Sequence, residues 1–141
     1  MCDRSSVAHG WRYEIIERDW SEVRATLEVV DWHDDDGQYL LDVIDSVLEV
    51  GADEVLALST SMHDLMVAPR PVSSPPLDVV VVAAPGSGRS HAAGTVRIDH
   101  IAVNGPNTEI ERPADQAVPL FWRVLWEEFG ITAVRPDRNR P

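Results

Sequence analysis

The feature that most constrains the fold is an apolar run in the middle of the chain. Residues 77–84 read LDVVVVAA, and the strictly apolar stretch continues from Val79 to Pro85. A Val-rich run of this length is typical of a strand that is covered on both faces. It is far shorter than the ~20 apolar residues that a membrane-spanning helix needs. We therefore expect a sheet with this strand at its centre and no membrane span.

Several shorter segments have the composition or the alternation of strands, and turn residues separate them. Residues 69–76, with four Pro, and residues 85–94, with three Gly, are expected to be loops. The further predicted strands are residues 11–18, 54–60, 95–103 and 108–112.

Residues 22–30 fit two structures. Apolar residues at every second position favour a strand, and apolar residues at helical spacing favour a helix. We predict a strand because the segment contains three Val and a Thr, and we pair it with residues 11–18 in a hairpin. The alternating set is Val23, Ala25, Leu27 and Val29, and the helical set is Trp20, Val23, Leu27 and Val30.

Two segments have the periodicity of amphipathic helices. Residues 38–50 end before Gly51, a residue suited to a helix C-terminus, and residues 119–129 begin at Pro119 and end before Gly130. The buried stripe is predicted to be Leu40, Leu41, Ile44, Val47 and Leu48 in the first helix, and Phe121, Trp122, Leu125 and Phe129 in the second.

Two helices and about five or six strands, joined by hairpins rather than by repeated βαβ units, predict an α+β fold. We expect a mainly antiparallel sheet with the two main helices packed on one face. The chain of 141 residues suits a single globular domain over residues 1–141. Residues 1–10 and 135–141 are expected to be flexible.

The net charge of −12 is confined to the N-terminal half of the chain. Residues 1–68 contain sixteen acidic residues and four Arg, whereas residues 69–141 contain eight of each. This asymmetry disfavours nucleic acids and anionic membranes as partners and favours cationic proteins. An acidic surface that serves only solubility is the simpler alternative.

Cysteine and lysine usage exclude several kinds of site. A lone Cys, Cys2, excludes an internal disulfide framework and a Cys-based zinc finger. With no apolar secretory signal in MCDRSS at the N-terminus, we expect a cytoplasmic protein. All twelve basic residues are Arg, which excludes a Schiff-base or P-loop lysine and fits a GC-rich coding bias, as in actinobacteria.

The candidate catalytic and metal-binding groups each have a simpler explanation. His33 stands among Asp residues, but neighbouring Asp residues rarely converge on one ion, so capping of the next helix explains them better. The Gly-rich segment with His91 leads into a predicted strand rather than the helix that a phosphate loop needs. Asp99 and His100 point to opposite faces of their strand. We predict no catalytic residue, no metal and no cofactor.

The residues that we predict to bind a partner surround the start of the first helix. Spacings of three and four place the acidic residues of this helix on one side of it, and three further Asp precede it. A Trp beside carboxylates is a typical interface anchor for an Arg-rich partner. The predicted site consists of Trp32, Asp34, Asp35, Asp36, Asp42, Asp45 and Glu49.

Residues 111–120 (ERPADQAVPL) and the predicted helix up to Gly130 resemble the C-terminal part of small actinobacterial immunity proteins of polymorphic toxin systems. The similar segment of that family has an acid, a Pro-Ala step and Val-Pro-Leu leading into an amphipathic helix. The resemblance implies a cytoplasmic protein that binds and blocks a cognate toxin and has no chemistry of its own.

These observations predict a non-catalytic acidic binding module, of immunity or inhibitor type, that blocks a basic protein partner such as a toxin. The alternative is a small-molecule-binding protein or an enzyme with a pocket of His and carboxylates, for which His33, His91 and His100 are the candidates. A third hypothesis is a homodimer that forms through a sheet edge or through the Trp-bearing C-terminal helix.

Overall fold

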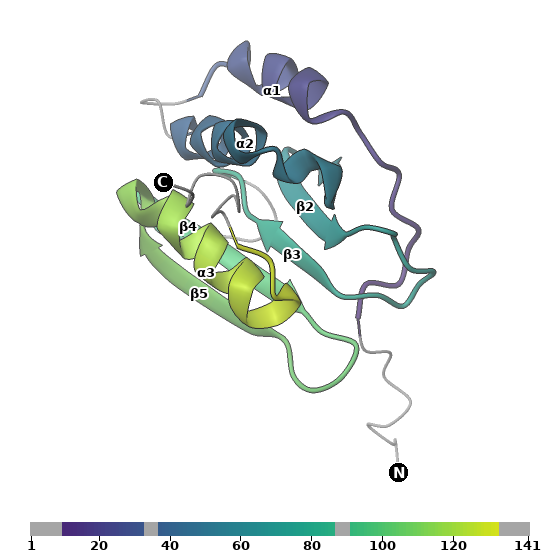
Figure 1. Cartoon of the computed structure of the whole chain (residues 1–141). Coiled ribbons are helices and arrows are strands. Elements are labelled where there is room, and N and C mark those ends of the chain that lie inside the picture. Colours follow the sequence, from purple (N-terminus) through teal and green to yellow (C-terminus); the bar gives the residue numbers. More distant parts are fainter. Residues whose placement is uncertain (1–9, 33–36, 87–90, 133–141) are drawn as a thin grey trace, which may run out of the picture.

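A computed structural model describes residues 10–32, 37–86 and 91–132. Within these residues, five strands form one sheet in their chain order, and three α-helices pack against it (Figure 1). The strands are β1 (Leu56–Ser61), β2 (Asp64–Pro69), β3 (Val79–Val82), β4 (Thr95–Ile101) and β5 (Thr108–Pro113). The helices are α1 (Trp20–Glu28), α2 (Gln38–Val50) and α3 (Ala117–Phe129), with short 3-10 turns η3 (Ala52–Glu54) and η4 (Ala114–Gln116).

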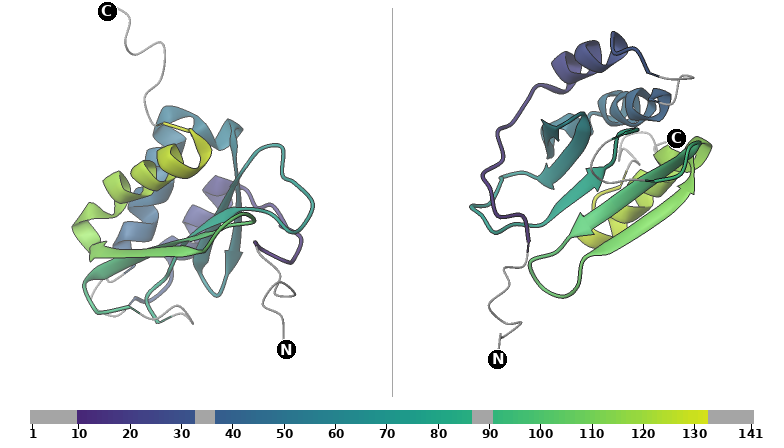
Figure 2. Two further views of the ribbon diagram at one scale, coloured as in Figure 1. Left: turned by 90° about the horizontal axis from the view of Figure 1, so that it is seen from below. Right: turned by 180° about the vertical axis from the view of Figure 1, so that it is seen from behind.

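The architecture is the α+β fold that the hairpin pattern predicts. Every neighbouring pair of strands is antiparallel. The helices share one apolar core with the same face of the sheet, and the left view of Figure 2 shows α2 and α3 on one side of it. Helix α2 contacts both α1 and α3, so it is the middle helix of this layer. The structure has one helix more than the two that we predicted.

The Val-rich run forms the central strand, as predicted. In β3, Val80 and Val82 face the helices, whereas Val79 and Val81 belong to a second apolar cluster on the other face of the sheet. The second cluster is partly covered by the segment before α1, through Trp11 and neighbouring residues. Both faces of β3 are therefore dry, which explains why its sequence shows no polar alternation.

The predicted hairpin of residues 11–18 and 22–30 is wrong. Residues 11–18 run along the sheet and make only two isolated bridges, from Trp11 to Leu77 and from Arg18 to Leu58. Residues 22–28 belong to helix α1, which is the alternative that the helical set of apolar residues favoured.

Long-range contacts explain why α1 is a helix. The Asp19 carboxylate caps it by accepting from the amide of Ser21 at 2.8 Å. The Trp20 indole N–H donates to the carbonyl of Leu56 in β1 at 3.0 Å, and Trp20, Val23 and Leu27 are buried against the core. Burial of these three side chains outweighs the strand preference of the β-branched residues.

The other two helices agree with the sequence pattern. Helix α2 covers the predicted residues 38–50, and Gly51 ends it in the left-handed conformation with φ of 74°. Helix α3 begins at Ala117, two residues before the predicted start, because η4 leads directly into it. Gly130 ends α3 in the same way, with φ of 71°.

Gly37 precedes α2 where the Trp32 indole covers the backbone. A Cβ atom at position 37 would lie 2.3 Å from Cδ2 of Trp32, although the φ of −90° suits any residue. We expect Gly37→Ala to lower the free energy of unfolding by about 1–3 kcal/mol through overpacking, measured by urea denaturation. In a Trp32→Ala background the same substitution should cost almost nothing. An equal loss in both backgrounds would contradict this assignment.

Candidate functional site

Helix α2 presents three of the predicted partner-binding residues on its outer side. Asp42, Asp45 and Glu49 are exposed, while the intervening apolar residues pack into the core. The structure therefore brings these carboxylates together on one helical face, as their spacing predicts. With Glu28 of α1, which lies 3.4 Å from the same Arg24 that pairs with Asp45, they form what we call the acidic surface.

Asp34, Asp35 and Asp36 lie outside the described residues, and so does His33. Their predicted roles, partner binding for the three Asp and pocket formation for His33, remain predictions.

Asp45 is engaged within the molecule. Its carboxylate accepts two hydrogen bonds from the Arg24 guanidinium, at 2.5 Å and 3.1 Å, and Arg24 also lies 3.4 Å from Glu28. The hydrogen bond and charge of Asp45 raise the pKa of Arg24 further above its already high range. Arg24 is the only basic residue between positions 19 and 54. The ion pair of Arg24 and Asp45 thus links α1 to α2. Asp42 and Glu49 are the other two predicted residues of α2, and both are exposed.

Trp32, the predicted anchor, is half-buried at the border of the acidic surface. Its indole N–H donates to the carbonyl of Leu27 at 3.2 Å, and its ring meets the edge of His63 at a centroid distance of 5.5 Å. His63 and Met62 form the β1–β2 turn, both with positive φ, and Met62 is 79% exposed. Trp32 is therefore held in a fixed orientation between the end of α1 and the β1–β2 turn.

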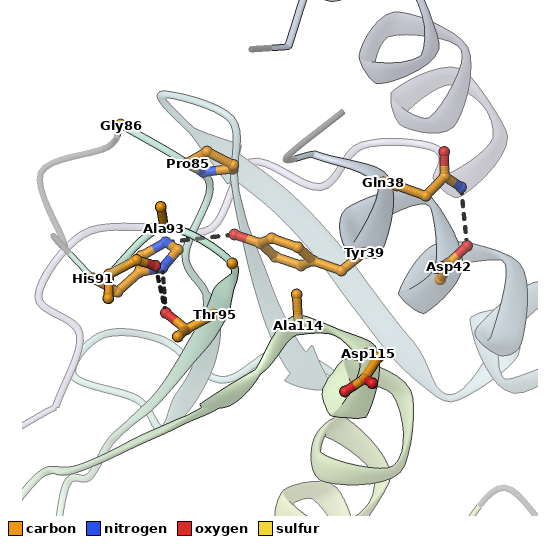
Figure 3. A pocket seen from close by; sticks show the side chains of 12 residues that line it. Gln38, Tyr39, Asp42, Pro85, Gly86, His91, Ala93, Thr95, Ala114 and Asp115 are labelled. Atoms are coloured by element: carbon orange, nitrogen blue, oxygen red, sulfur yellow. Dashed lines mark hydrogen bonds between the residues drawn. The ribbon is translucent and has the colours of Figure 1, made fainter. Parts of the chain in front are cut away.

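A pocket of about 410 Å³ lies between three parts of the chain: the start of α2, the loop that precedes β4, and η4 (Figure 3). Its wall combines polar side chains with small apolar ones. The lining residues are Gln38, Tyr39, Asp42, Pro85, Gly86, His91, Ala92, Ala93, Gly94, Thr95, Ala114 and Asp115. We call this cavity the α2–β4 pocket; its volume lies within the range of small-ligand sites.

A chain of polar contacts crosses the α2–β4 pocket. The buried Tyr39 hydroxyl donates to the carbonyl of Ala83 at 2.5 Å and lies 3.5 Å from Nε2 of His91 (Figure 3). Nδ1 of His91 in turn lies 3.2 Å from the hydroxyl of Thr95. These contacts hold the phenol and the imidazole ring in defined positions, so the polar part of the wall is preorganised.

Glu111 of β5 supports the pocket from behind. Its carboxylate accepts from the amide of Ala92 at 3.1 Å and from the hydroxyl of Thr95 at 2.9 Å. These hydrogen bonds, that of the Ala92 amide first, lower the pKa of Glu111 below its ordinary value. Glu111 therefore carries its negative charge at neutral pH, next to the pocket.

His100 was a candidate for a pocket of His and carboxylates, but it does not line the α2–β4 pocket. It is 6% exposed, with Nε2 at 3.4 Å from Asp78 and Nδ1 at 3.2 Å from Glu128. Its ring also packs edge-on against Phe129. His100 links β4 to α3, whereas its neighbour Asp99 pairs with Arg97 on the other face of the sheet, as strand alternation predicts.

The pocket includes residues that the sequence pattern did not single out. His91 and Asp42 were candidates, but Tyr39 and Thr95 belonged only to the predicted helix 38–50 and the predicted strand 95–103. Tyr39 and His91 are 52 positions apart, and no local pattern links them. The pairing of β4 with β5 is what brings Thr95 close to Glu111.

Comparison with protein-family models, with curated proteins and with solved structures gives no match. Among the described residues, no group of three or more His, Cys, Asp and Glu is placed to hold a metal ion. The same part of the chain contains no helix with the length and apolar character needed to span a bilayer.

The hydrogen bond from the Thr95 hydroxyl to Glu111 should have a measurable effect on the pKa of the Glu111 carboxyl. Because the lowered pKa reflects bonds to the ionised form, these bonds are present at neutral pH and are lost as the pH falls through that pKa. Thr95→Val should raise the pKa of the Glu111 carboxyl towards its ordinary value, as followed by carbon-detected NMR.

Thr108→Val, at the start of β5, is the matched control and should leave the Glu111 titration unchanged. An unaltered Glu111 titration in Thr95→Val would show that the hydroxyl does not hold this carboxylate.

Proposed function

We propose that this protein is a non-catalytic binding module of immunity or inhibitor type, which blocks a basic protein such as a toxin. The observation that carries the proposal is the acidic surface of α1 and α2. Between positions 19 and 54 the chain has twelve carboxylates and a single Arg, and that Arg is paired with Asp45. The resemblance of residues 111–130 to immunity proteins is in line with this function, and such a protein acts in the cytoplasm.

Electrostatics explains how such a surface works. Nucleases and similar toxins carry cationic clefts for their substrates, and an array of carboxylates can occupy such a cleft. Complementary charge accelerates the encounter of two proteins and disfavours anionic competitors such as nucleic acids. Asp42 and Glu49 have the exposure that this role requires.

Apolar contacts at the border add affinity that charge alone does not supply. Trp32 is fixed by its bond to Leu27 and by its contact with His63, so a partner that covers it loses little side-chain entropy. Trp is one of the residue types enriched at interface hot spots.

The edge strand β5 gives little support to the hypothesis of a homodimer that forms through the sheet. Strand β5 forms an edge, but it carries Glu109, Glu111 and Arg112 and ends in Pro113. Charged residues and Pro on an edge strand disfavour pairing with a second sheet. Trp126 of α3, 60% exposed, is the remaining candidate for such a contact.

A small-molecule site is the second candidate function, favoured by the α2–β4 pocket. The ordered contacts of Tyr39, His91 and Thr95 give this cavity the convergent polar groups of a ligand site.

The test uses a purified basic protein that binds this chain, sought first among the products of the neighbouring genes. We expect the association rate to fall at least about tenfold between low and high salt, because steering of exposed charges is screened. Asp42→Asn combined with Glu49→Gln should slow association by about threefold at low salt, measured by stopped flow.

Glu14→Gln combined with Glu127→Gln removes the same charge from positions outside the acidic surface and serves as the control. It should slow association much less. A rate that stays constant over the salt range, or that falls equally in both double variants, contradicts the proposal.

A further inference from the structure

We infer that a groove on the face of the sheet opposite the helices binds a neutral sugar, with the apolar face of a pyranose ring on its aromatic wall. The groove lies between the extended segment before α1 and the strands β1 and β2, and its volume is about 340 Å³. Met66, which lines it, belongs to the apolar cluster of that face. The volume is within the range of small-ligand sites. We call it the β1 groove.

The β1 groove lies apart from the site on which the proposed function rests. None of the described residues that line it belongs to the acidic surface or to the α2–β4 pocket. The inference is therefore independent of the proposed function.

The outer wall of the groove is tied to the sheet at both of its ends. The backbone N–H of Trp11 donates to the carbonyl of Leu77 at 2.8 Å. At the other end, the backbone N–H of Arg18 donates to the carbonyl of Leu58 at 2.7 Å, and its guanidinium donates to the hydroxyl of Thr60 at 3.0 Å. Between these anchors the segment runs along the sheet (right view of Figure 2). Because the wall is held in place before a ligand binds, less entropy is lost on binding.

Two aromatic side chains line the groove. The rings of Trp11 and Tyr13 meet edge to face at a centroid distance of 5.9 Å, and Tyr13 is 63% exposed. The C–H groups on one face of a pyranose ring form an apolar surface of about the size of such a ring, and can stack on it. The contact with Trp11 orients Tyr13, so stacking requires little further ordering of this side chain.

The polar groups of the groove suit a ligand that carries hydroxyl groups. Thr60 and Ser61 contribute hydroxyls, which both donate and accept hydrogen bonds. The Arg18 guanidinium can only donate, and the Glu14 carboxylate can only accept. A sugar hydroxyl does both, so one ligand can serve all four groups. A phosphate would be repelled by the carboxylate and an ammonium group by the guanidinium, which favours a neutral ligand.

The experiment titrates the intact ¹⁵N-labelled chain with the methyl pyranosides of glucose, galactose, mannose and N-acetylglucosamine. We expect at least one of them to give saturable shifts at Tyr13, Arg18 and Ser61, with millimolar affinity. Sorbitol is the control, because this linear polyol has the hydroxyls of a hexose without the apolar face of a ring. It should bind at least about fivefold more weakly.

Variants locate the binding. Tyr13→Ala should weaken the sugar at least about fivefold, and Ser61→Trp, which places an indole at an exposed position of the groove, should abolish binding. Trp126→Ala removes a ring that is 60% exposed on α3, and Ser21→Trp adds an indole at the start of α1. These two controls should leave the affinity unchanged. Spectra of each variant without sugar establish that it is folded.

The outcomes decide the inference without deciding the proposed function. The sugar site is overturned if no pyranoside of the panel binds, if sorbitol binds equally well, or if Tyr13→Ala and Ser61→Trp keep full affinity. An equal loss in Trp126→Ala would place the sugar elsewhere and overturn it as well. A basic partner should bind Ser61→Trp as tightly as the unmodified chain, so the acidic surface and the β1 groove can fail separately.

Discussion

The apolar contact between the helices and one face of the sheet determines where the charge of this molecule lies. Helices α1 and α2 use their apolar stripes for this contact, through residues such as Leu27 and Ile44, and cannot turn them to solvent without losing the core. Their polar stripes must therefore face outward. Because every charged residue of α1 and α2 except Arg24 is acidic, this packing creates the acidic surface on which the proposed function rests.

Much of this fold can be predicted from local patterns, because packing and pattern agree there. The Val-rich run predicts β3, and apolar periodicity ending at a Gly predicts α2 and α3. Helix α1 could not be predicted because its apolar residues fit both the two-residue period of a strand and the 3.6-residue period of a helix. The contact that decides between them, the bond from the Trp20 indole to Leu56, joins residues 36 positions apart and has no local signal.

The candidate site also has one part that local sequence patterns predict and another part that depends on long-range contacts. Helical spacing correctly places Asp42, Asp45 and Glu49 on one exposed side. The neutralisation of Asp45 depends on how α1 packs on α2, so it is visible only in the structure. The α2–β4 pocket is further removed from any pattern, since Tyr39 and His91 come together only when the sheet forms. Sequence reasoning thus identified the acidic face of α2 in the candidate site and missed the cavity beside it.

Hydrogen–deuterium exchange of the chain, alone and in complex with the proposed basic partner, tests the central claim most directly. The account predicts that such a partner slows exchange in α1 and α2. The opposite face of the sheet, including residues 11–16 and 72–77, should exchange as in the free chain. Protection confined to that opposite face, with α1 and α2 unaffected, would contradict the account.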